Sequence, residues 1–241
     1  MTTASPSVST VPQPAGAPAQ KSAFTAFWLF KTERTAAPRS GDERDAAVAS
    51  ITEVIASHEA KVQLRAAYST AGLSAGVDLI LWVISDSCDS LQDLATDLRP
   101  TVGGQLLDMR HTYLGVASMS QYDPEHGAAF LRGLPPRQYL SVYPFSKTPD
   151  WYLLPWETRR DLMIEHGRMG QEFPSILTNT VNSFGIADQE FIVALEDDDP
   201  AILVQMVQRL RGAEVRKYTL LDTPIFLGRR MELGDAIRAA I

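Results

Sequence analysis

The chain repeats its own apolar pattern about halfway along its 241 residues, and this repeat limits the folds that it can adopt. The repeat has an offset of 112 residues: the segment 78–81 matches 190–193, and the helical stripe Leu91, Leu94, Leu98 matches Leu203, Met206, Leu210. Each half then predicts the order strand, helix, strand, strand, helix, strand, which is the ferredoxin-like unit. Two such units can pair their sheets edge to edge and so remove exposed edges. We therefore expect an α+β fold in which tandem ferredoxin-like repeats form a dimeric α+β barrel.

Changes in composition suggest where the two units begin and end. Residues 1–22 are rich in Pro, Ala, Ser and Thr, with neither a basic start nor an apolar core segment, and they predict a disordered leader, not a signal peptide. We expect an N-terminal ferredoxin-like unit at 23–118, a linker at 119–138, a C-terminal unit at 139–231 and a tail at 232–241. The first helix is expected over 42–58, with Asp42 as its N-cap.

Charge and cysteine content exclude several classes of function. A net charge of −7 argues against a duplex nucleic-acid partner, which would require a basic face. The single cysteine, Cys88, excludes an internal disulfide and a cysteine-built metal site, and it fits a reducing compartment, the cytoplasm. The longest apolar run, residues 77–84, is too short to span a membrane. The sequence also contains no phosphate-binding glycine loop and no short histidine pair for zinc.

The helix expected to begin near Pro155 carries a histidine within its apolar stripe. This face consists of Leu162, His166, Met169 and Phe173, at spacings of four, three and four residues. A histidine in such a stripe can be a hydrogen-bonded core residue or a metal ligand. Gly167 and Gly170 would leave the adjacent helix surface open to a flat ligand, so haem-type ligation by His166 remains an equal alternative on these residues alone.

The other candidate residues have both a structural and a functional interpretation. Tyr143 could be a packed strand aromatic or a redox residue, and Lys147 could be a surface charge or the cation for a carboxylate ligand. His126 lies in the linker, where it could be solvent-exposed or could act as an acid or base. Glu214 could be a solvated charge or the acceptor that orients His166. Trp151 is expected chiefly as a core anchor.

Several segments together resemble a known family. They are VYPFSKTPDWYLLP, EHGRMG, NTVNSFG, DQEFIVALE and RKYTLLDTPIFLGRR. Over residues 24–231 the chain resembles the chlorite dismutase-like superfamily, in particular coproheme decarboxylases of the actinobacterial type. The resemblance implies a dimeric α+β barrel, assembled into a homo-oligomer that is typically a pentamer, with the porphyrin bound by the unit at 139–231.

The resemblance also assigns roles to individual residues near the porphyrin iron. His166 would be the iron ligand, and Glu214 would be its hydrogen-bond partner, although a slip of one residue would put Val215 there. Tyr143 would be oxidised to a radical that takes a hydrogen atom from a propionate. His126 would be the distal base that deprotonates hydrogen peroxide.

Further residues would hold the porphyrin in place. Lys147 would be a propionate-binding cation at a position where the actinobacterial proteins usually carry arginine. Arg137 and Lys217 would be further cations for the propionates, and Trp151 would line the pocket. The implied reaction is the peroxide-dependent decarboxylation of two propionates of iron coproporphyrin III, which yields haem b.

Two alternatives remain beside the decarboxylase. A chlorite dismutase would convert chlorite to chloride and dioxygen on a permanently bound haem b. That activity relies on a distal arginine, and here Thr178, with Asn179 beside it, occupies the corresponding place in the porphyrin pocket. Because neither side chain is a cation, the decarboxylase is preferred. The second alternative is a non-catalytic porphyrin-binding barrel.

Overall fold

The structure of the chain is a computed structural model, which describes residues 23–33, 35, 40–117 and 127–241. The expected leader and residues 119–126 of the expected linker, which include His126, lie outside the described residues. No helix within the described ranges is long and apolar enough to cross a membrane.

Within the described residues, the N-terminal half contains four strands and two α-helices in the order expected of a ferredoxin-like unit. These elements are β1 (Ala23–Thr32), α1 (Gly41–Ser57), β2 (Gln63–Ser69), β3 (Leu79–Ser85), α2 (Cys88–Leu98) and β4 (Leu107–Ala117), with the short 3-10 turn η2 (Gly104–Leu106) before β4. The N-cap of α1 is Ser40, whose side chain accepts a hydrogen bond from the backbone N–H of Glu43, so the expected cap at Asp42 is wrong by two residues. A hydroxyl in extended backbone can reach the free amides of the first turn, and Asp42 already lies inside that turn.

The C-terminal half follows the same order, with additional short elements and a final helix. These are η3 (Ala129–Arg132), β5 (Tyr139–Lys147), α3 (Pro149–Leu153), α4 (Trp156–Gln171), β6 (Leu177–Asn182), β7 (Phe191–Asp197), α5 (Pro200–Leu210), η4 (Glu214–Tyr218), β8 (Thr219–Leu221), β9 (Phe226–Met231) and α6 (Leu233–Ala240).

The internal repeat is present in the structure at the offset seen in the sequence. Adding 112 to the bounds of β3 (79–85) and α2 (88–98) gives the bounds of β7 (191–197) and α5 (200–210). The turns before these strands also correspond, since Gly72 and Gly185 both adopt a left-handed φ, of 75° and 74°. The two halves are therefore structural repeats.

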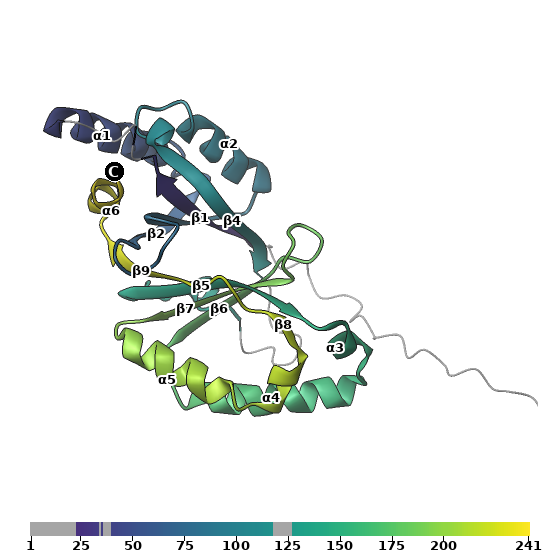
Figure 1. The fold of residues 1–241 in the computed structure, drawn as a ribbon. Helices are drawn as coiled ribbons and strands as arrows, with labels where there is room; N and C mark the ends of the chain where they lie inside the picture. Colours follow the sequence, from purple (N-terminus) through teal and green to yellow (C-terminus); the bar gives the residue numbers. More distant parts are fainter. Residues whose placement is uncertain (1–22, 34, 36–39, 118–126) are drawn as a thin grey trace, which may run out of the picture.

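The strands of the described part of the chain form one nine-stranded sheet, in which β7, at one end of the strand order, also pairs with β5 near the other end. The order is β7-β6-β4-β1-β3-β2-β9-β5-β8, and β5 pairs in addition with β7. Both connections between the halves are antiparallel: β4 meets β6 at Val116 and Asn182, and β2 meets β9 over residues 67–69 and 229–231. In Figure 1 the helices α1, α2 and α6 cover the strands of the first half, and α4 and α5 cover those of the second half. These elements confirm the α+β class.

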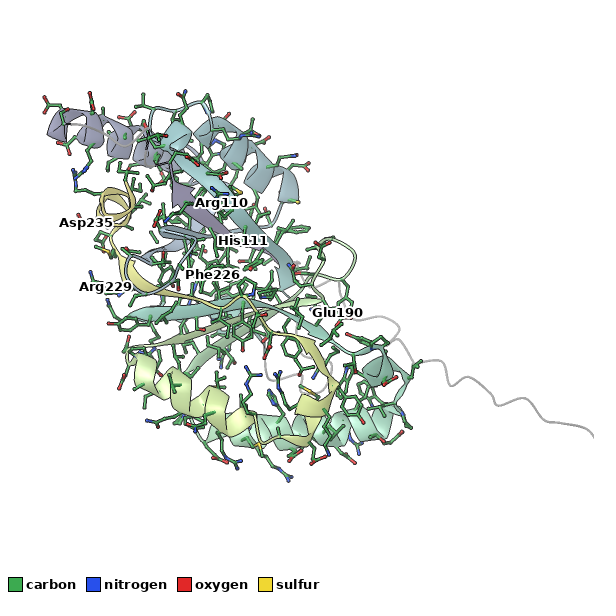
Figure 2. The ribbon with its side chains drawn as sticks, in the orientation of Figure 1. Arg110, His111, Glu190, Phe226, Arg229 and Asp235 are labelled. Atoms are coloured by element: carbon green, nitrogen blue, oxygen red, sulfur yellow. The ribbon has the colours of Figure 1, made fainter. Side chains whose placement is uncertain are left out.

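The largest core lies between the strands of the two halves. It contains Phe27, Tyr68, Trp82, Leu140 and Ile192, all of which are fully buried. Figure 2 shows His111 of β4 and Phe226 of β9 in this interior, where their ring centroids are 5.1 Å apart. Residues from both halves therefore fill one apolar space, and neither half could bury this surface alone.

A buried carboxylate also connects the halves. Glu196 on β7 is 0% exposed, and its Oε1 accepts hydrogen bonds from Arg65 Nη2 of β2 at 2.8 Å and from Asn179 Nδ2 of β6 at 3.0 Å. Its Oε2 accepts from the backbone N–H of Arg137 at 3.0 Å. A charge this deeply buried requires such partners, because desolvation would otherwise be too costly.

The segment expected to be a tail is instead helix α6, which packs on the first half. Ala236 and Ile237 are 0% exposed, in the core cluster formed by α1, α2 and the outer face of the first sheet. Thr32 Oγ1 donates to the carbonyl of Ala240, and Arg238 pairs with Asp45. The apolar face of α6 finds its partner about 180 residues earlier in the chain, next to α1, which local sequence cannot reveal.

Candidate functional site

Strand β5 places Tyr143 on the face of the second sheet that α4 and α5 cover. Successive strand residues point to opposite faces, so Tyr143 and Phe145 share this face, whereas Leu140 and Val142 are buried in the central core. Tyr143 packs against an apolar cluster of Leu195, Leu203 and Met206, from β7 and α5. Tyr143 therefore has the packing role expected of a strand aromatic. Its phenol is also influenced by the charges of Arg211, Arg216 and Asp222.

Lys147 ends β5 as a buried cation between aromatic rings. Lys147 is 9% exposed, and its Nζ lies 4.5 Å from the ring centroid of Trp151 and 5.1 Å from that of Phe145. Burial, reinforced by the positive charge of Arg216, lowers the pKa of Lys147 to about 8, against the opposing effect of Glu190. The interpretation of Lys147 as a surface charge is wrong, and the ring faces partly replace the water that the ammonium has lost.

His166 lies on α4 beside this cation. Burial, followed by the positive charge of Lys147, lowers the pKa of His166 to about 4, so the imidazole is neutral at pH 7. Its Nδ1 is buried and has no hydrogen-bond partner among the described residues. Leu162 and Met169, one turn to each side, pack in a cluster with Trp151, as the helical stripe predicted. A buried ring nitrogen without a partner is rare in proteins and points to a missing metal or hydrogen-bond partner.

The partner expected for His166 is engaged elsewhere. Glu214 accepts a hydrogen bond from Lys217, and both side chains are exposed, at 59% and 69%. The next residue, Val215, is 4% exposed and packs with Trp151. Because η4 turns Val215 inward, Glu214 faces outward, and the described residues show no hydrogen bond between Glu214 and His166. This arrangement corresponds to the alternative considered from the sequence, in which Val215 takes the inward position in place of Glu214.

The other expected porphyrin-binding cations form ion pairs within the chain. Lys217 makes the surface pair with Glu214. The guanidinium of Arg137 pairs with Asp198 at 3.3 Å, and the backbone of Arg137 belongs to the buried Glu196 network. Both residues make contacts that the linear sequence does not show, and their role as cations for the propionates stays a prediction.

Two arginines that sequence reasoning did not select lie near Tyr143 instead. Asp222 Oδ2 accepts hydrogen bonds from Arg216 Nη1, at 2.8 Å, and from Arg211. Burial raises the pKa of Tyr143 to about 12, Arg211 and Arg216 act to lower it, and Asp222 acts to raise it. The density of basic residues in RLRGAEVRK was the available signal, but spacing alone did not single out Arg211 and Arg216.

Thr178 lies on β6, on the same face of the second sheet as Tyr143. It is exposed and pairs with Leu195, while Thr180, two residues further, pairs with Val193, which in turn pairs with Tyr143. Asn179 faces the opposite way, is 0% exposed and donates to Glu196. Strand alternation therefore puts an uncharged hydroxyl, Thr178, on the helix-covered face.

Glu190 marks the end of the site near α3, as Figures 1 and 2 show. Its carboxylate accepts hydrogen bonds from the backbone N–H of Lys147 at 2.7 Å and from the hydroxyl of Tyr152 at 2.6 Å. Tyr152 also contacts the ring of Phe184, with centroids 6.0 Å apart. Phe184 is 50% exposed, so this end of the site is partly open and aromatic.

Comparison with known proteins identifies the family. A curated coproheme decarboxylase from Mycolicibacterium smegmatis is 30% identical over 213 residues, which are 88% of this chain and 92% of that protein. The solved structure of the chlorite dismutase from Candidatus Nitrospira defluvii in complex with imidazole is 21% identical, with a TM-score of 0.82 over 89% of this chain and 93% of the other. A mutant form of the same enzyme gives the same values. The family described as chlorite dismutase matches residues 44–231, and the chain therefore belongs to the chlorite dismutase family.

Proposed function

We propose that this chain is a coproheme decarboxylase, which uses hydrogen peroxide to convert two propionates of iron coproporphyrin III to vinyl groups and so forms haem b. The observation that carries the proposal is the grouping of Tyr143 with Lys147, Arg211 and Arg216, beside the neutral His166. An oxidisable phenol next to cations suits a substrate whose reacting groups are carboxylates. The relative from Mycolicibacterium smegmatis, named a coproheme decarboxylase, supports this choice.

The residues present fit an iron porphyrin. Iron requires a neutral imidazole, and the low pKa of His166 keeps the ring neutral at physiological pH. The buried Nδ1 without a hydrogen-bond partner indicates an imidazole whose ring nitrogens are not all satisfied within the described residues, as expected if a metal or a hydrogen-bond acceptor completes the site. His166 would hold the iron, and Trp151, Lys147 and Thr178 would surround the macrocycle. The bound iron with peroxide would supply the oxidising equivalents.

Tyr143 performs the step at the propionate. Its pKa of about 12 keeps the phenol protonated at neutral pH, so it must lose an electron and a proton together when it is oxidised. The phenoxyl radical then takes a hydrogen atom from the propionate side chain, which restores the phenol. Loss of carbon dioxide and of one further electron leaves the vinyl group, and one peroxide accepts both electrons as it forms two molecules of water.

The other residues bind and orient. Lys147, Arg211 and Arg216 would hold propionate carboxylates so that one of them lies at Tyr143. Lys147, with a pKa of about 8, is largely protonated at pH 7 and provides positive charge in a site with little water. His126 is proposed as the base for peroxide, in keeping with the family resemblance.

The alternative activity is less well supported by the same residues. A chlorite dismutase needs a cation at the position of Thr178, where the side chain is an uncharged hydroxyl, and Asn179 is turned into the buried network. A non-catalytic porphyrin-binding protein would have no use for a phenol placed among cations. Both alternatives are outcomes of the experiment below.

We also propose a homo-oligomer, a pentamer as the family resemblance implies, located in the cytoplasm. Leu153, Val204 and Leu220 are 82%, 66% and 67% exposed, and large apolar side chains at such exposure are available for contacts between subunits. Light scattering of the purified chain would give the number of subunits. A single exposed cysteine, Cys88, suits a reducing compartment.

The test is to add iron coproporphyrin III and hydrogen peroxide and to follow the porphyrin by mass spectrometry. Two successive losses of the mass of formic acid, each the departure of carbon dioxide and two hydrogen atoms, are expected. Tyr143→Phe should bind the porphyrin nearly as well as wild type and should lose at least about 99% of turnover, because phenylalanine keeps the packing but cannot form the radical. Tyr139→Phe, a change on the same strand, is the matched control. Dioxygen release from chlorite, or bleaching without carbon dioxide, would favour the alternatives.

A further inference from the structure

We propose that Glu190 is a positioning residue for Lys147: its carboxylate anchors the end of β5 to α3, and it supplies a negative charge close to this buried cation. The inference rests on the proposed function, in which Lys147 binds a propionate carboxylate of the substrate. It adds the residue that keeps Lys147 charged and in place. Glu190 acts through Lys147 and not on the porphyrin itself.

Among the described residues, no acidic side chain forms an ion pair with the buried charge of Lys147. Its Nζ instead contacts the ring faces of Trp151 and Phe145, at 4.5 and 5.1 Å. Burial and the positive charge of Arg216 lower the pKa of Lys147, whereas the carboxylate of Glu190 raises it. Ring faces replace only part of the hydration of an ammonium group, so the proton on Lys147 depends on the charge of Glu190.

Hydrogen bonds of Glu190 join three segments around Lys147. One carboxylate oxygen, Oε2, accepts from the backbone N–H of Lys147 at 2.7 Å and from the hydroxyl of Tyr152 on α3 at 2.6 Å. The backbone N–H of Glu190 donates to Ser146 Oγ at 3.2 Å, and its carbonyl accepts from the N–H of Ser183, which follows β6, at 2.8 Å. The position of Lys147 relative to α3, whose tryptophan contacts its amine, therefore depends on Glu190.

An acidic residue occupies the same position in the first half of the repeat. Asp78 and Glu190 lie at the 112-residue offset, and each directly precedes a strand, β3 or β7. Asp78 Oδ2 accepts from the backbone N–H of Thr32, the last residue of β1, at 2.9 Å, as Glu190 accepts from the last residue of β5. Asp78 also pairs with Lys31 at 2.7 Å. In each half the acidic residue therefore anchors the end of the first strand and counters the charge of a lysine there.

The experiment measures the titration of individual lysines in the full chain, without porphyrin. Trace acetylation with acetic anhydride from about pH 6 to about pH 11, followed by peptide mass spectrometry, gives the midpoint of each lysine because only the neutral amine reacts. Lys61, which is exposed, is the internal reference. Glu190→Gln keeps an amide oxygen that can accept both hydrogen bonds but loses the charge, so it should lower the Lys147 midpoint by about one unit.

Asp78→Asn is the matched control, because it removes the acidic residue at the same repeat position in the other half. It should leave the Lys147 midpoint unchanged. An unchanged or higher Lys147 midpoint in Glu190→Gln would overturn the proposal, because Glu190 would then be only a strand anchor. If Glu190→Gln does not fold, Glu190→Asp moves the charge by one methylene group and should lower the midpoint by about half a unit, and no change in that variant would equally overturn the proposal.

A titration with iron coproporphyrin III, followed by the Soret absorbance, connects this result to the proposed function. A carboxylate binds the protonated form of Lys147, so the affinity should fall as the pH rises through the lysine midpoint, and in Glu190→Gln this fall should occur about one unit lower. The same pH profile in wild type and Glu190→Gln would overturn the role of Glu190 in substrate binding. A shifted lysine midpoint in a chain that binds no porphyrin would instead refute the proposed function and leave the control of Lys147 by Glu190 in place.

Discussion

Burial of the Lys147 charge should lower the stability of the folded chain, so we expect the variant Lys147→Met to be more stable than wild type. The pKa of Lys147 falls from 10.5 to about 8 in the folded chain. At about 1.4 kcal/mol per unit, the folded state is penalised by about 3 kcal/mol wherever the lysine is protonated in both states. Methionine has nearly the same shape without the charge. Loss of the contacts to the rings of Trp151 and Phe145 offsets about 1–2 kcal/mol, so we expect a net gain of about 1–2 kcal/mol at pH 7.

The pH dependence of the free energy of unfolding is a second test of whether the buried Lys147 charge destabilises the fold. Between the folded pKa and the unfolded pKa, the unfolded chain binds more protons at this site, so stability rises as the pH rises from about 8 towards 10.5 and the penalty is full below pH 8. Urea unfolding at pH 7 and at pH 9.5 should therefore show an advantage of Lys147→Met that shrinks by about 2 kcal/mol at the higher pH.

Lys61→Met provides the control, because Lys61 is an exposed lysine. Its difference from wild type should not vary with pH beyond about 0.5 kcal/mol. If the difference between Lys147→Met and wild type is the same at both pH values, the buried lysine does not have a lowered pKa, and the reasoning about its charge is wrong.

Two further predictions concern the ligand residue and the connection between the halves. His166→Ala should shift the Soret band of the bound iron porphyrin and weaken its binding, whereas His58→Ala, a change in a histidine that pairs with Asp97 on the first half, should do neither; an unchanged spectrum for His166→Ala would remove it as a ligand. Glu196→Gln should lower the free energy of unfolding by about 3 kcal/mol, because the guanidinium of Arg65, 5% exposed, then lacks its counter-charge. A similar loss for the 64% exposed Asp198, changed to Asn, would contradict that explanation.

Periodicity along the chain predicted the repeat because each unit is built from local patterns. The apolar spacing in β3 and α2 recurs in β7 and α5 at the same offset, and the turns use glycine at the same left-handed conformation. The stripe on α4 likewise identified His166 as an inward residue, since helical spacing alone decides which side chains share a face.

Only the tertiary structure determined which charged side chains form ion pairs. Lys217 and Arg216 are neighbours in sequence, yet one pairs with Glu214 at the surface and the other with Asp222 beside Tyr143. Val215, between Glu214 and Arg216, is the buried residue of the turn, and its packing on Trp151 directs the charged side chains on either side. Ion pairing depends on which segments pack together across long distances, so local sequence carries little information about it. Helix α6 illustrates the same limit, because its apolar face is explained only by the first-half surface that it covers.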